Sequence, residues 1–208
     1  MLLELHPTTV WLDRAARDPT QRQPHRLPET LDFRPWAPLL RAYARGALPD
    51  TEIGCPIVAG DLEIHFPTDL AWQARYPAQL AGGWFVGTFH VHPPGREPVF
   101  DPHDLAGLLR SDNAGFLDLL AAGARLLALV RTNPFLYVAA DRVNRDPWLF
   151  RETFEREIRR RSPPPTPDRP EYEQACSRAL RYYCERYQLA LYQGSFDEPL
   201  RRTFTPRP

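Results

Sequence analysis

Lysine is absent from this 208-residue sequence, so arginine supplies all 26 of its basic residues. The 26 acidic residues balance them, and a net charge of zero gives no overall attraction for nucleic acid or for an anionic membrane. No apolar run approaches the roughly 20 residues that span a bilayer. The segment from Met1 to His6 lacks the basic start and long apolar core of a signal peptide. We therefore expect no nucleic-acid partner and no membrane partner.

Cysteine is also scarce. Cys55, Cys176 and Cys184 do not have the spacing of metal ligands, and an odd number does not suit a disulfide framework. Three such cysteines fit a reducing compartment, so we expect a cytoplasmic protein. The remaining composition, with 43% apolar and 25% charged residues, is typical of a folded globular chain. Its length is enough for one core and a small appendage.

Two histidines at the end of an apolar segment are the first candidate functional residues. The residues from Trp84 to His92 are rich in aromatic and β-branched side chains, which predicts a strand. Residues i and i+2 of a strand point to the same face, so the rings of His90 and His92 should lie side by side. Pro93 and Pro94 then end the strand where the imidazoles are presented.

An acidic segment follows these histidines. Asp101 can cap a helix that begins at Pro102, and the leucines after it give that helix an apolar stripe. Asp104 then lies in the first turn, from which its carboxylate can face the end of the strand. Two neutral imidazoles and one carboxylate are a common ligand set of catalytic zinc, which binds a water of pKa about 7 in its fourth position. The pattern therefore predicts a hydrolytic zinc site.

These residues resemble the signature of the JAMM metalloprotease family, also called MPN-plus or JAB. That signature is an upstream glutamate, then His-x-His-Pro, then Ser-x-x-Asp about eight residues later. His90, His92 and Pro93 match the middle part, and Asp104 matches the final aspartate. The resemblance covers roughly residues 34 to 143, and it implies that His90, His92 and Asp104 bind Zn²⁺.

Two glutamates compete for the role of general base. The resemblance points to Glu52, because the family glutamate lies between a first helix and a glycine-containing strand. It would take a proton from the water and pass it to the leaving amine. Glu63 is the alternative, although it alternates with apolar residues in a predicted strand over 62–66 and should face solvent.

Asp101 stands where the family has a serine, whose hydroxyl is taken to help stabilise the tetrahedral intermediate. Either residue can cap the helix. An ionised carboxylate, however, only accepts hydrogen bonds and would repel a developing oxyanion. A catalytic Asp101 would have to be protonated. If Asp101 is ionised, there are three alternatives. Its side chain turns away from the intermediate, another group such as His103 donates the hydrogen bond to the oxyanion, or the enzyme is slow.

The other segments predict an α/β fold. We expect a mixed β-sheet flanked by helices, and the resemblance implies the layered, cytidine-deaminase-like architecture of the JAB domain. The expected helices cover 35–45, a segment from Pro102 to a break at 113–115, and 116–122. The expected strands cover 1–12, with 8–12 as its β-prone part, and 57–59, 62–66, 84–92, 125–130 and 135–140.

Composition divides the chain into three parts. Residues 1–161 would form the JAB-like metalloprotease domain and end in an amphipathic helix over 148–161. Residues 162–170 contain five prolines and predict a stiff linker. Residues 171–208 would add a C-terminal helix over 172–192 and an extended tail.

The resemblance implies a zinc-dependent peptidase or isopeptidase that acts at the C-terminal tail of a ubiquitin-like protein, in deconjugation or precursor processing. Its partners would be that protein or its conjugate, and the activating and conjugating (E1- and E2-like) enzymes. Two alternatives stay open. One is a non-catalytic scaffold or adaptor of the same fold, and the other is a small-molecule zinc amidohydrolase.

The missing lysine has two explanations. A genome rich in G and C favours arginine codons, and the 24 prolines agree with this. A protein that works among lysine-conjugating enzymes would also gain by having no lysine to be modified.

Overall fold

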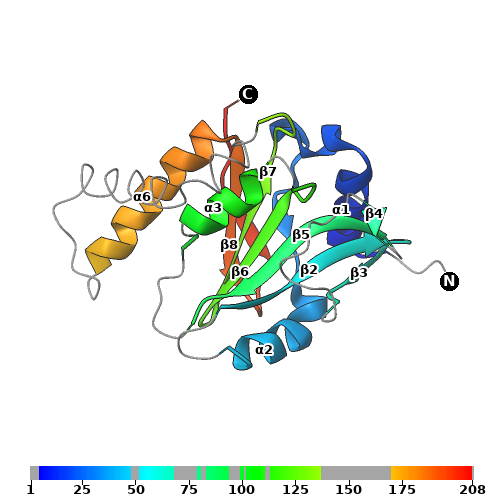
Figure 1. Cartoon of the computed structure of the whole chain (residues 1–208), viewed down its shortest axis with the longest axis horizontal. Coiled ribbons are helices and arrows are strands. Elements are labelled where there is room, and N and C mark those ends of the chain that lie inside the picture. Colours follow the sequence, from blue (N-terminus) through cyan, green and yellow to red (C-terminus); the bar gives the residue numbers. More distant parts are fainter. Residues whose placement is uncertain are drawn as a thin grey trace.

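The computed structural model describes residues 5–47, 52–67, 79–80, 83–93, 99–100, 102–110, 113–136 and 170–207. They form an α/β fold on a mixed, curled sheet with the strand order β1-β9-β8-β7-β6-β5-β2-β3 (Figure 1). β5 and β6 are parallel, and the other described pairs are antiparallel. The strands are β1 (Thr30–Leu31), β2 (Ile53–Gly60), β3 (Glu63–His65), β4 (Gln79–Leu80), β5 (Gly83–Val91), β6 (Leu117–Ala122), β7 (Arg125–Arg131), β8 (Leu189–Ser195) and β9 (Leu200–Phe204).

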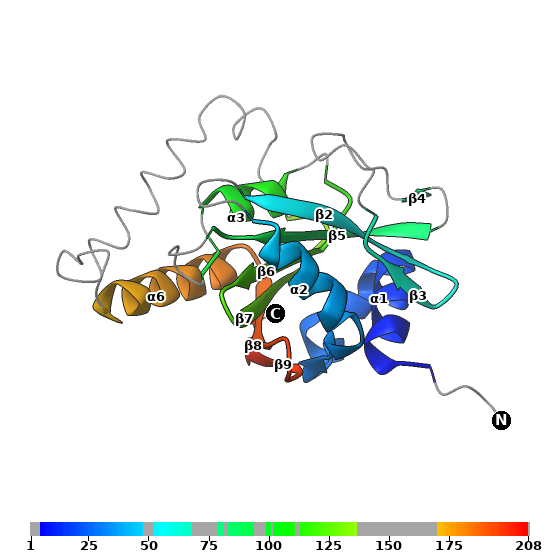
Figure 2. The same cartoon turned by 90° about the horizontal axis from the view of Figure 1, so that it is seen from below.

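The helices lie on both faces of this sheet. Figure 2 shows the sheet curling around α1 (Pro7–Arg17) and α2 (Ala37–Arg45), while α3 (Pro102–Leu109) and α6 (Pro170–Arg186) lie on the other face. Short 3-10 turns cover Pro19–Arg22, Pro24–Arg26 and Arg34–Trp36. In the described part of the chain, no helix is both long and apolar enough to cross a membrane.

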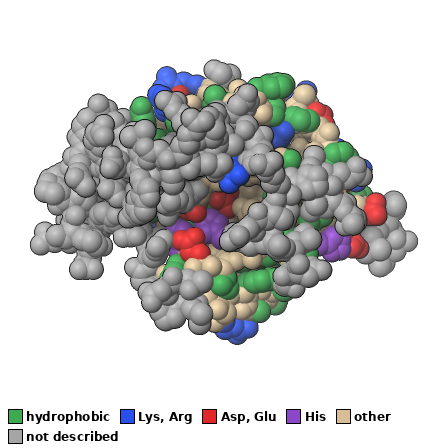
Figure 3. Space-filling model, viewed as in Figure 1, with side chains coloured by type: hydrophobic (Ala, Val, Ile, Leu, Met, Phe, Trp, Pro, Cys, Tyr) green, Lys and Arg blue, Asp and Glu red, His purple; other side chains and the backbone are tan. Residues whose placement is uncertain are grey.

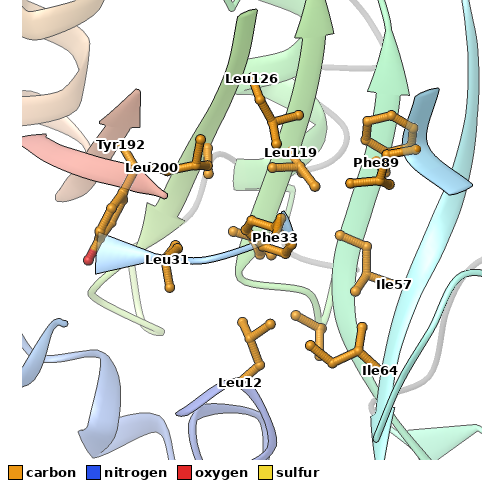
Figure 4. Packing of buried hydrophobic residues seen from close by; sticks show 14 of the residues in the cluster. Leu12, Leu31, Phe33, Ile57, Ile64, Phe89, Leu119, Leu126, Tyr192 and Leu200 are labelled. Carbon is orange, nitrogen blue, oxygen red and sulfur yellow. The ribbon is translucent and has the colours of Figure 1, made fainter. Parts of the chain in front are cut away.

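The face covered by α1 and α2, which we call the inner face, carries the larger apolar cluster. Leu119 of β6 and Phe89 of β5 point into it and meet Leu12 of α1 and Phe33 (Figure 4). Each is nearly or fully buried. Burying one such side chain stabilises the fold by roughly 1.5–3 kcal/mol.

The opposite, outer face holds a second apolar cluster. Leu120 of β6 packs there with Leu105 of α3 and with Leu180 and Cys184 of α6. Successive residues of β6 thus enter different clusters, as the two-residue period of a strand requires. The central strands are therefore buried on both sides.

The segment from Thr8 to Leu12, predicted as a strand, is helical. Pro7 begins α1, where its fixed φ and missing N–H suit the first turn. Thr8, Leu12 and Ala15 are buried and recur at intervals of three or four residues, so one face of the helix packs on the sheet. This burial outweighs the β-propensity of the local sequence.

Residues 116–122, predicted as a helix, contain strand β6. All of its residues are buried, because it lies between β5 and β7 and both of its faces are covered. A strand buried on both faces has no polar alternation, and periodicity cannot distinguish it from a buried helix. Its parallel register pairs Thr88 with Asp118 and His90 with Leu120.

The C-terminal segment belongs to the same sheet. The helix predicted over 172–192 ends at Arg186 as α6, and the last part of that range is strand β8, paired with β7. The tail predicted as extended contains β9, which pairs with β8 and β1. The hydroxyl of Tyr192 donates to the carbonyl of Pro28, and Arg202 donates to the carbonyl of Leu27. The two ends of the chain therefore meet in one sheet.

The other predicted elements that lie in the described part are mostly confirmed. They correspond to α2, β2, β3, β5, α3 and β7. Phe135 and Leu136 lie at a turn, not in the strand predicted over 135–140. The rest of that strand, the helix over 148–161 and most of the linker over 162–170 lie outside the described residues.

Candidate metal centre

His90 and His92 lie at the C-terminal end of β5, on the outer face of the sheet. Both are buried, and their ring centroids are 5.3 Å apart. Histidine and acidic side chains are visible together in a hollow near the middle of this face (Figure 3). The side-by-side arrangement predicted from the i, i+2 spacing is confirmed.

Asp104 reaches the histidines from the first turn of α3. Its Oδ1 is 3.2 Å from Nε2 of His90, and its Oδ2 is 3.5 Å from Nε2 of His92. One ligand atom from each of the three residues can be chosen so that all lie within 4.8 Å of one another. Ligand atoms around tetrahedral zinc are separated by roughly 3.3 Å, given bonds of about 2.0–2.1 Å. The group could therefore hold a metal ion.

Nε2 of His90 has an unusual environment. It is buried and makes no hydrogen bond to any described group, although Oδ1 of Asp104 is only 3.2 Å away. A buried polar atom without a hydrogen bond is unfavourable and needs an explanation. A cation beside Nε2 would satisfy this atom.

The electrostatics of the site favour positive charge. Burial lowers the pKa of His90, but the carboxylates of Asp118 and Asp104 outweigh it and hold this pKa well above its usual value. Burial raises the pKa of Asp104, but the imidazoles of His90 and His92 outweigh it and make the net shift downward. The pKa of Asp118 is raised, chiefly by burial. A proton or a metal cation can supply the charge that these buried carboxylates require.

Asp118 is a site residue that sequence reasoning missed. It is buried on β6, and its Oδ1 lies 3.0 Å from Nδ1 of His90. The hydroxyl of Thr88 donates to the same oxygen over 2.9 Å. The available signal was a single aspartate in the apolar segment 116–122, but a helix there gives no reason for it to face His90.

The structure separates the two candidate bases. Glu52 directly precedes β2, and its Oε1 is 3.9 Å from Nε2 of His92. Its side chain is 39% exposed, so it can contact both the buried ligands and solvent. Glu63 pairs with Gly60 at the opposite end of β2, where its exposed carboxylate lies 3.6 Å from His65. Of the two glutamates, Glu52 is the one that lies beside the candidate metal centre.

Asp101 and the side chain of His103 lie outside the described residues, so the roles predicted for them stay predictions. The fold and the site together define an α/β protein with a candidate metal centre of two histidines and one aspartate. The sequence matches no family model, and no curated protein or solved structure matches the chain.

Proposed function

We propose that this protein is a zinc-dependent peptidase or isopeptidase of the JAMM type, which cleaves at the C-terminal tail of a ubiquitin-like protein. The observation that carries the proposal is the convergence of His90, His92 and Asp104, whose ligand atoms lie within 4.8 Å of one another, with the carboxylate of Glu52 beside them.

The residues present fit zinc. Two imidazole nitrogens and one carboxylate oxygen form a donor set of the kind that catalytic zinc sites use, with a fourth position open. When bound, zinc would lower the pKa of a water ligand to about 7 and polarise the scissile carbonyl. The carboxylate of Asp104, whose pKa the two imidazoles lower, would balance part of the charge of a dication, which favours its burial here.

Glu52 is the proposed general base. Its Oε1 would accept the proton of the attacking water and return it to the leaving nitrogen. The position next to His92 suits this role, because a base must lie within reach of the water at the open side of the ligand set. Its partial exposure lets the carboxylate meet an incoming substrate.

The edge of β2 next to Glu52 supports a peptide substrate. Among the described strands, β3 pairs only with Val58 to Gly60, and in the rest of β2 only Ile53 and Gly54, next to Glu52, are partly exposed. An extended tail can add to such an edge through main-chain hydrogen bonds, which tolerate side chains that are not recognised. A flexible C-terminal tail is a substrate of this kind.

Elemental analysis of the purified protein tests the metal first. We expect about one zinc per chain, as three protein ligands imply, and loss of this zinc in His90→Ala and Asp104→Ala. A ubiquitin-like protein with a C-terminal extension then tests the chemistry. Glu52→Gln should keep its zinc and lose cleavage, whereas the matched control Glu63→Gln should keep both. Absence of zinc from the wild type, or cleavage unaffected in Glu52→Gln, would refute the proposal.

A non-catalytic scaffold is the second candidate. The aspartate at position 101, where the family has a serine, favours it. The complete ligand set favours an enzyme. A wild-type protein that binds zinc but cleaves neither peptide nor isopeptide bonds would support the scaffold.

A further inference from the structure

We propose that Asp118 is a positioning residue, which holds the ring of His90 so that Nε2 is its metal-binding atom. This inference rests on the proposed metal centre. It concerns a carboxylate that contacts a ligand and is not itself a ligand.

The burial of Asp118 requires an explanation. It is 4% exposed, in a strand whose other residues are all apolar. Burial of a carboxylate is costly unless it is paired and hydrogen-bonded. Its hydrogen-bond partners are Nδ1 of His90 and the hydroxyl of Thr88, and both contact Oδ1. Both partners lie on β5, so Asp118 joins β6 to the strand that carries His90.

The hydrogen bond determines which nitrogen of His90 carries the proton. When Asp118 is ionised its carboxylate can only accept, so a neutral His90 hydrogen-bonded to it has its hydrogen on Nδ1. Nε2 then carries the lone pair, and this is the atom 3.2 Å from Asp104 that makes no hydrogen bond to a described group. A carboxylate behind a metal-binding histidine orients the ring and increases its basicity.

The parallel pairing of β5 and β6 produces this arrangement. Thr88 is directly opposite Asp118, and His90 follows two residues later on the same face of β5. A shift of one residue in the register would turn Asp118 to the inner apolar face. The backbone N–H of His92 donates to the carbonyl of Ala121 over 2.9 Å, so the main chain stays paired with β6 one residue beyond the end of β5. Asp118 therefore acts on His90.

Zinc affinity tests the role directly. Zinc alone, in competition with a chelating dye, is titrated into the wild type and variants after metal removal. We expect Asp118→Ala to weaken zinc binding by about 10–100-fold, the usual effect of losing such a partner. Asp118→Asn should lose less, because an amide oxygen can still accept from Nδ1. Thr88→Val should lose least, because it removes only the second hydrogen bond to Oδ1.

Asp13→Asn is the matched control. Asp13 is another buried aspartate, but it pairs with Arg17 within α1, on the inner face. The variant Asp13→Asn should have a lower free energy of unfolding than the wild type and the same zinc affinity. Equal loss of zinc affinity in Asp13→Asn and Asp118→Ala would show that Asp118 acts only through stability, and the proposal would be wrong.

The ring nitrogens give a second readout that a structural role would not change. Nitrogen NMR of the zinc-loaded wild type should show a protonated Nδ1 and a metal-bound Nε2 at His90, and Asp118→Ala should lose the protected Nδ1–H signal. If Asp118→Ala does not fold, Asp118→Asn and Thr88→Val decide the question. Zinc bound by the wild type and by all three variants with equal affinity overturns this inference alone. A wild type that binds no zinc overturns both the inference and the proposed function.

Discussion

The two faces of the sheet use the same strands for different purposes. On β5, Phe89 and Val91 point to the inner face and join a purely apolar cluster, whereas Thr88 and His90 point to the outer face and join a polar one. The larger apolar cluster lies on the inner face and stabilises the fold by burial. On the outer face, Asp118, His90 and His92 are polar residues at buried positions. The larger apolar cluster and the candidate metal centre thus lie on opposite faces of one sheet.

The largest expected effect comes from the inner face. Phe89→Ala should destabilise the protein by about 3–5 kcal/mol, because it removes a fully buried ring and leaves a cavity. Chemical denaturation of the metal-free protein measures this loss. Any variant that remains folded should still bind zinc with wild-type stoichiometry. Loss of zinc in a folded Phe89→Ala protein would show that the two faces are not independent.

Removal of the metal tests the outer face. A ligand that binds only the folded state stabilises it, by about 2.7 kcal/mol at 100 times its dissociation constant. We expect a chelator to remove this stabilisation from the wild type. In His90→Ala the same chelator should leave the free energy of unfolding unchanged, and a chelator effect of wild-type size in that variant would contradict the ligand assignment.

The outer face should also depend on pH. The pKa of His90 is raised above 6.5, so its contribution to the stability of the zinc-free protein is present below pH 6.5 and is lost as pH rises through the folded-state pKa. Zinc requires the neutral ring, so zinc affinity should fall as pH decreases, beginning above 6.5, with release of a proton on binding. Calorimetry in buffers of different ionisation enthalpy measures that proton.

The smallest effect is expected at Asp32, next to the inner face. Hydrogen bonds from Arg34 lower the pKa of Asp32 to about 2. The depressed pKa gives stability above pH 3.8 that is lost as pH falls towards 2. Arg34 is exposed, so the contribution should stay below about 1 kcal/mol. Asp32→Asn should flatten this acid dependence without affecting zinc, and unchanged acid dependence in that variant would contradict the assignment.

Local patterns in the sequence were sufficient for part of this molecule. The strand and helix that carry His90, His92 and Asp104 could be predicted, because an i, i+2 pair and a capped helix depend only on neighbouring residues. The role of Asp118 could not be predicted, because Asp118 and His90 are 28 positions apart and their contact depends on the pairing of two strands. The same limit applies to β6, whose burial on both faces hides its period.

The ends of the chain show the same limit. Thr8 to Leu12 has the composition of a strand but forms a helix, since the concave side of the sheet is covered by one apolar helix face. The residues after Arg186 enter the sheet through pairing with β7 and β1, which no local pattern indicates.

The single parallel pair among the described strands also has a consequence for the order of folding. Parallel strands need a crossover, and here the crossover contains α3, so the residues from Thr88 to Asp118 bring the whole ligand set together within a short stretch of chain. The contact between Arg202 and Leu27, in contrast, joins residues 175 positions apart. Closing a short loop loses less entropy and is faster. We therefore expect the ligand set to assemble early, with a bound ion acting as a cross-link before the two ends of the chain have met.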